Sequence, residues 1–148
     1  MESLARFKED PSRVVLLAPL IFGIHVSEEA PEFVHWFNSL VAQGISQKLF
    51  TEVNIAALVI TAIVTALLAL TRGRPAALLA LGWLSFLMFA NAIFHLTGTV
   101  VHRRYSPGVV TAAALYIPYF IWFLWLVCRR FAVSAVKAIA IMLLVLLC

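Results

Sequence analysis

Charged residues are scarce in this chain of 148 residues. Asp, Glu, Lys and Arg together make up 12% of the sequence, about half of the roughly 25% found in soluble domains. Hydrophobic residues make up 64%, against roughly 45–50% in soluble domains, so the composition does not fit a water-soluble protein. It predicts an all-α integral membrane protein, with residues 1–148 forming a single transmembrane domain.

Cysteine is rare as well, with only Cys128 and Cys148. These residues are predicted to lie at opposite faces of the membrane, so neither an internal disulfide nor a thiolate metal site is indicated. The net charge of +4 comes from short Arg and Lys clusters between apolar runs, which is typical of topology signals and not of a nucleic-acid-binding surface. We expect membrane lipid as a partner and no nucleic acid, and the sequence leaves room for an oligomer.

Five apolar runs approach the roughly 20 residues that cross a hydrocarbon core of about 30 Å. We predict that they form a compact bundle of about five transmembrane helices. Between the first two runs, aromatic residues recur at helical spacing beside polar ones, which predicts an amphipathic helix in the membrane interface. The predicted spans cover residues 14–30, 52–70, 76–101, 109–128 and 131–148, and the interfacial helix covers residues 31–47.

The basic residues predict the orientation of these spans. With five spans, seven Lys and Arg residues fall on the amino-terminal side and three on the opposite side. Because cytoplasmic loops carry the excess of positive charge, we expect a cell-membrane protein with its amino terminus in the cytoplasm and its carboxyl terminus outside. The seven are Arg6, Lys8, Arg13, Arg72, Arg74, Arg129 and Arg130, and the three are Lys48, Arg103 and Arg104.

Three ionisable residues stand near the end of the first apolar run: His25, Glu28 and Glu29. In a helix the glutamates follow the histidine by three and four residues, so both carboxylates can approach the same imidazole. Ionisable residues inside a span are costly, and they normally face one another or the interior of the bundle. This motif is therefore the first candidate for a functional site.

Two further spans bring polar residues to the same leaflet. Because the chain changes sides with each span, Glu52 at the start of the second span lies at this level, and so do Asn91 and His95 in the far half of the third. A shared polar pocket between three helices is the economical arrangement of such groups.

These residues suit two kinds of chemistry, which the sequence leaves open. A carboxylate beside an imidazole is a general acid and base pair. The same groups can bind a divalent metal, zinc or iron, although His-x-x-Glu reverses the Glu-x-x-His order of diiron bundles. The candidate catalytic residues are His25, Glu28, Glu29, Asn91 and His95, and the candidate metal ligands are His25, Glu28, Glu29, Glu52 and His95.

Three segments in this order resemble the HXXEE-motif family of small multi-span membrane proteins. They are His25-Val26-Ser27-Glu28-Glu29, Asn91-Ala92-Ile93-Phe94-His95, and Tyr105-Ser106-Pro107-Gly108 followed by Thr111 and Pro118. The resemblance implies that the histidines, glutamates, Asn91 and the turn at residues 105–108 form a functional set. It implies no particular substrate.

We expect an intramembrane enzyme that acts on an apolar or lipid-like molecule entering from the bilayer, by isomerisation, cyclisation or hydrolysis. The substrate-binding candidates are Trp36 and Asn38 of the interfacial helix, together with Tyr105 and Tyr116. Two alternatives stay open: a transporter or ion-relay protein, and a non-catalytic accessory subunit in which the polar residues only join helices. A transporter should carry polar residues through both leaflets, and here they concentrate in one.

Overall fold

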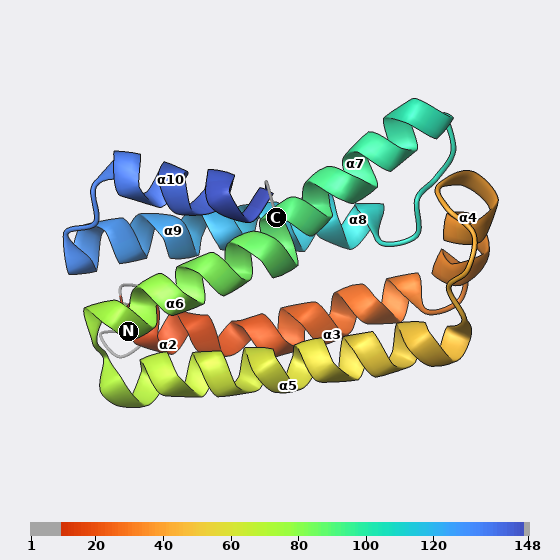
Figure 1. Ribbon diagram of the computed structural model, residues 1–148. Helices are drawn as coiled ribbons and strands as arrows, with labels where there is room; N and C mark the ends of the chain where they lie inside the picture. Colours follow the sequence, from red (N-terminus) through yellow and green to blue (C-terminus); the bar gives the residue numbers. More distant parts are fainter. Residues whose placement is uncertain (1–9, 147–148) are drawn as a thin grey trace.

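The computed structural model describes residues 10–146, and the regular elements of that part of the chain are all helical. Four helical rods run along one long axis, and the short helix α4 (Phe33–Leu40) crosses one end of them (Figure 1). The rods are α2–η1–α3 (Pro11–Val14, Val15–Leu17, Ala18–Glu29), α5 (Gln47–Thr71), α6–η2–α7 (Arg74–Leu84, Ser85–Ala90, Asn91–His102) and α8–η3–α9 (Val109–Thr111, Ala112–Tyr116, Ile117–Phe131).

Three of these rods are long and apolar enough to cross a membrane. They are Gln47–Thr71, Arg74–His102 and Val109–Phe131, with 25, 29 and 23 residues. The first rod, Pro11–Glu29, meets this criterion only together with α4, against which it is bent by 65°, so the described chain has up to four candidate spans. The prediction of an all-α membrane protein is confirmed.

The predicted fifth span is not confirmed. Helix α9 continues to Phe131, where the fifth span was expected to begin, and the next helix, α10, covers Ala135–Leu146. Its 12 residues correspond to about 18 Å, well short of a hydrocarbon core of about 30 Å. Helix α10 lies antiparallel to α9 and ends near the middle of the bundle (Figure 1). Cys148 lies outside the described residues.

A proline interrupts the first rod. Pro19 has no N–H and cannot bond the carbonyl of Val15, four residues earlier, and the 3-10 segment η1 lies just before it. The hydroxyl of Tyr119 donates to the carbonyl oxygens of Val14 and Val15, at 3.2 and 3.3 Å. Tyr119 thus adds a donor to carbonyls that lack their regular helical donor, and it ties α9 to the first rod.

Helix α4 lies where the amphipathic helix was predicted, but it has eight residues and does not extend over residues 31–47. The side-chain amide of Asn38 closes the turn that follows α4. Its Oδ1 accepts hydrogen bonds from the backbone N–H groups of Gly44 and Ile45, and its Nδ2 donates to the carbonyl of Ile45 at 2.8 Å. Asn38, expected to bind substrate, therefore holds the turn between α4 and α5.

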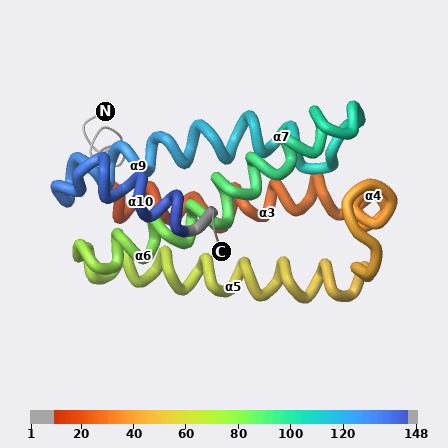
Figure 2. Tube along the Cα trace, turned by 45° about the horizontal axis from the view of Figure 1, so that its top comes forward, coloured from red at the N-terminus to blue at the C-terminus, as the bar shows by residue number. Residues whose placement is uncertain are grey.

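Helix α4 closes the end of the bundle at which the first rod ends, α5 begins and the third rod turns into the fourth (Figure 2). The indole of Trp36 docks it there. A Cβ atom on Gly98 of α7 would lie 2.8 Å from the Trp36 ring, so only a glycine allows this close approach. The buried polar residues of the motif lie at this end.

Candidate functional site

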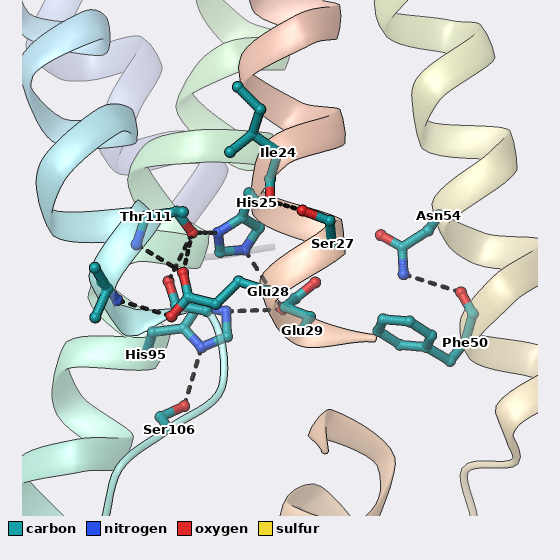
Figure 3. Close-up of polar contacts among 12 residues, drawn as sticks. Ile24, His25, Ser27, Glu28, Glu29, Phe50, Asn54, His95, Ser106 and Thr111 are labelled. Atoms are coloured by element: carbon teal, nitrogen blue, oxygen red, sulfur yellow. Dashed lines mark hydrogen bonds and ion pairs between the residues drawn. The ribbon is translucent and has the colours of Figure 1, made fainter. Parts of the chain in front are cut away.

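Three ionisable side chains meet between the first and third rods. His25 and Glu29 come from α3 and His95 comes from α7 (Figure 3). The Oε1 atom of Glu29 lies 3.4 Å from Nε2 of His25 and 2.9 Å from Nε2 of His95. The two histidines are fully buried and Glu29 is 4% exposed. We call this set the His–Glu–His cluster.

The two Nε2 atoms of the cluster are close to the carboxylate, yet neither makes a hydrogen bond of acceptable geometry. The three potential ligand atoms lie within 4.8 Å of one another. Ligands of a tetrahedral zinc ion, at bonds of 2.0–2.1 Å, lie about 3.3 Å apart. Two of the three separations, 3.4 and 2.9 Å, are thus near the spacing of metal ligands, and the cluster could hold a metal ion.

The opposite ring nitrogens are held by hydroxyl groups. Nδ1 of His25 lies 2.8 Å from Oγ1 of Thr111, and Nδ1 of His95 lies 3.0 Å from Oγ of Ser106. Thr111 Oγ1 donates its single proton to the nearby carboxylate of Glu28, at 2.5 Å, so it can only accept from His25. This network assigns the proton of neutral His25 to Nδ1 and leaves a lone pair on Nε2, facing Glu29.

Glu28 points away from the cluster, toward the start of the fourth rod (Figure 3). Its two oxygens accept hydrogen bonds from the backbone N–H groups of Val110 and Thr111, at 3.1 and 2.8 Å. Helix α8 has no side-chain cap of its own, because Gly108 occupies the N-cap position. A carboxylate from another helix therefore caps it, where the helix dipole favours a negative charge. Both oxygens of Glu28, a predicted metal ligand, thus bond the start of α8.

Tyr105 joins the same carboxylate from the loop between α7 and α8, and its hydroxyl donates to Oε1 of Glu28. Its ring is 55% exposed, so it lies at the edge of the site. The hydrogen bond to the Glu28 carboxylate, with smaller effects of burial and of the negative charge, raises the pKa of Tyr105 to about 12. Tyr105 was expected to bind substrate, and here it orients Glu28.

Gly108 forms one wall of the cluster. Its φ angle is +100°, and a Cβ atom there would lie 2.8 Å from Cε1 of His95, 2.9 Å from Cε1 of His25 and 3.0 Å from Cγ of Glu29. Both the backbone conformation and the space require glycine at this position. The turn thus closes the cluster on the side of the fourth rod.

The other predicted site residues lie at different distances from the cluster. Tyr116 is buried with its ring 4.2 Å from that of His25, and its hydroxyl has no partner. Trp36 is buried against Gly98 and does not reach the cluster. Glu52 is exposed on α5 and pairs with Lys48 at 3.7 Å, so the structure does not bring it to the other predicted ligands.

A cavity of about 270 Å³ ends at Glu29. Asn91 and Asn54 line it together with apolar side chains, and Figure 3 shows Asn54 and Phe50 projecting from α5 toward α3. Leu49, which also lines it, is 45% exposed, so the cavity is open at the surface of the bundle. The remaining lining residues are Phe33, Phe37, Ile45 and Val53.

The roles of Ser106, Gly108 and Thr111 were not predicted from the sequence, although all three lie in or next to the turn that carries the family resemblance. The sequence signal for these roles was the presence of two hydroxyl residues and a glycine within a few residues of one another. Which histidine each hydroxyl would hold depends on how the third and fourth rods pack, and residue spacing does not contain that information.

The fold and the site define a helical membrane protein with a buried His–Glu–His cluster. A family model described as a protein of unknown function with HXXEE motif matches residues 16–123. The match covers more than half of the chain, which therefore belongs to the HXXEE family, and it includes all three members of the cluster. Comparison with curated proteins and with solved structures found no match.

Replacing Gly108 by alanine should disrupt the cluster. We expect Gly108→Ala to lower the free energy of unfolding by about 1–3 kcal/mol from backbone strain alone, and by more if the histidine rings cannot move. Thermal unfolding in detergent measures the loss. Gly23→Ala is the matched control, because a Cβ atom there meets nothing within 4 Å and Gly23 lies inside a helix. Equal stability of the two variants would contradict the role of Gly108.

The hydrogen bond from Tyr105 to Glu28 should be visible in the titration of the phenol. Its pKa is raised from 10.0 to about 12, so the stabilisation is complete below pH 10 and is lost as the pH rises toward 12. We expect the tyrosinate absorbance difference between wild type and Tyr105→Phe to develop near pH 12. The same difference measured in a Glu28→Gln background should develop nearer pH 10. An unchanged midpoint in that background would show that Glu28 does not hold the phenol.

Proposed function

We propose that this protein is an intramembrane enzyme whose active site is the His–Glu–His cluster. The observation that carries the proposal is the position of the cluster: a buried carboxylate between two imidazoles lines a cavity whose walls include the exposed apolar residues Leu49 and Val53. An apolar or lipid-like molecule could enter from the bilayer and meet the cluster without passing through water. Isomerisation, cyclisation and hydrolysis all suit such a site.

We further propose that the cluster binds zinc or iron. Two imidazole nitrogens and one carboxylate oxygen are ligands that both metals accept in catalytic sites, where further positions stay open for substrate. The unpartnered Nε2 atoms of His25 and His95 support this assignment. The bound ion would supply Lewis-acid polarisation of a substrate oxygen.

The protein's own residues prepare the ligands. Thr111 fixes the ring of His25 and leaves its Nε2 lone pair directed at Glu29, and Ser106 holds the ring of His95 at Nδ1. In the absence of a metal, the carboxylate of Glu29 and the two imidazoles would still form a general acid and base set.

The distribution of buried polar groups favours an enzyme over an ion relay. Among the described residues, the buried imidazole and carboxylate side chains are His25, Glu29 and His95, all near the end of the bundle that α4 closes. The unpartnered hydroxyl of buried Tyr116 belongs to a ring that lies 4.2 Å from the ring of His25. The buried hydroxyls of Thr61, Thr65 and Ser85 donate to carbonyls of their own helices. A cation path through both leaflets would also need ionisable or unpartnered polar groups in the other half of the bundle.

We propose that the protein lies in the cell membrane with the α4 end outside. Five arginines of the described chain lie at the opposite end of the rods: Arg13, Arg72, Arg74, Arg129 and Arg130. Three basic residues lie at the α4 end: Lys48, Arg103 and Arg104. The excess at the first end is typical of a cytoplasmic face. Arg6 and Lys8 lie outside the described residues.

Elemental analysis of protein purified in mild detergent without chelators tests the metal. We expect about one equivalent of zinc or iron in wild type and its loss in His25→Ala and Glu29→Ala. Glu52→Gln should keep the metal, because that carboxylate is exposed and remote from the cluster. Circular dichroism and gel filtration must show that each variant is folded. Wild type free of metal after gentle purification would reject the metal site.

The positioning role of Thr111 can be tested by a change in metal affinity. Thr111→Val keeps the shape of the side chain and removes the hydroxyl that holds His25. Loss of an outer partner of a metal-binding histidine typically weakens the metal 10- to 100-fold. We expect a shift of that size in competition with a chelator, and wild-type affinity in Thr111→Val would exclude this role.

Single cysteines test the orientation. Ser39 on α4 and Arg72 at the far end are both exposed. In intact cells, a membrane-impermeant maleimide should modify Ser39→Cys, whereas Arg72→Cys should react only after permeabilisation. The opposite pattern would reverse the proposed orientation and leave the cluster unaffected.

A further inference from the structure

Asn91 carries an acceptor inside the bundle that nothing satisfies. Its Oδ1 atom is buried and has no hydrogen-bond partner. Such an atom costs free energy unless a donor reaches it. Asn91 begins α7, four residues before His95, and it lines the cavity that ends at Glu29. A donor group in that cavity would satisfy the acceptor next to the His–Glu–His cluster.

A second cavity lies beside the first one, toward the middle of the bundle. It has a volume of about 370 Å³ and shares the wall residues Val53, Asn54 and Asn91 with the first cavity, so the two are neighbours. Its other walls are apolar: Phe22, Ala57, Phe86, Leu87, Ala90 and Phe94. Along α5 the walls extend from Leu49 to Ala57, which is about 12 Å of helix. We call the two neighbouring cavities together the trough.

The charges of the trough limit what it can bind. Among the described residues that line it, none is Lys or Arg, and its carboxylate is Glu29. A phosphate or an ionised carboxylate would find no cationic side chain there and would set its own acceptors against Oδ1 of Asn91. A hydroxyl group is neutral and can donate to that atom. Val53 and Phe86 are more than half exposed, so the trough opens to the lipid.

We propose that the trough binds a single-chain apolar alcohol whose hydroxyl group donates to Oδ1 of Asn91. Its chain lies between α3, α5 and η2 and extends toward the bilayer centre, the direction of a hydrocarbon chain in one leaflet. Its hydroxyl end then faces the His–Glu–His cluster. This inference rests on the proposed function, because it assigns the substrate class of the same site.

Two photoreactive probes test the inference: a long-chain primary alcohol with a diazirine in its chain, and the methyl ether of that alcohol. We expect the alcohol to label wild type saturably. The ether donates no hydrogen bond and should need about three- to tenfold more probe for half-saturation. Asn91→Leu should abolish the difference between the probes. Thr97→Val, on the exposed face of the same helix, should retain it.

Equal labelling of wild type by both probes, or an unchanged preference in Asn91→Leu, would overturn the inference. The metal content of the same samples separates this outcome from the proposed function, because Asn91 is not one of the proposed ligands and its variant should keep the metal. Wild type with metal but without preference for the alcohol rejects the substrate class alone. Preference for the alcohol in a protein that binds no metal rejects the metal site alone.

Discussion

The burial of the Glu29 carboxylate is the constraint on which the site depends. A charge inside a helical membrane bundle finds no water, so the protein must surround it with groups that neutralise or bond it. Two imidazole nitrogens lie within 3.4 Å of one of its oxygens, and both histidines are themselves held from behind by hydroxyls. The first, third and fourth rods are therefore joined at a single point, and a displacement of any of them would break a contact to the histidines or to Glu29.

Two adjacent glutamates perform different tasks because consecutive helical residues point about 100° apart. Glu29 faces the third rod and its histidine, whereas Glu28 faces the fourth rod and caps α8. The two tasks are connected. Glu28 accepts the hydrogen bond of Thr111, so the ring proton of neutral His25 lies on Nδ1, away from Glu29. One carboxylate thus fixes the tautomer of a histidine that the other one faces, and this connects the two glutamates of the motif.

The sequence predicted the membrane class and the meeting of polar residues from the first and third rods, because hydrophobic runs and the cost of polar groups in lipid act at the level of single segments. It did not separate the roles of Glu28 and Glu29, since this requires knowing which helix packs on which face. Glu52 was assigned to the cluster from its depth, but its direction on α5 turns it to solvent beside Lys48. The π-helical segments η2 and η3 also make side-chain directions hard to predict from the sequence, because an inserted residue changes the face that the following side chains occupy.

Two glycines allow this closely packed site to form at the end of the bundle that α4 closes. Gly98 lets Trp36 pack directly on α7, which fixes α4 over the end of the bundle, and Gly108 lets the turn approach both histidines. With the end covered and the turn closed, the cavity beside Asn91 is left as an approach to Glu29, and the exposed residues of its wall include apolar Leu49 and Val53. The same packing that excludes water from the carboxylate would suit the apolar ligand proposed above, because a polar one would lose its hydration on the way in.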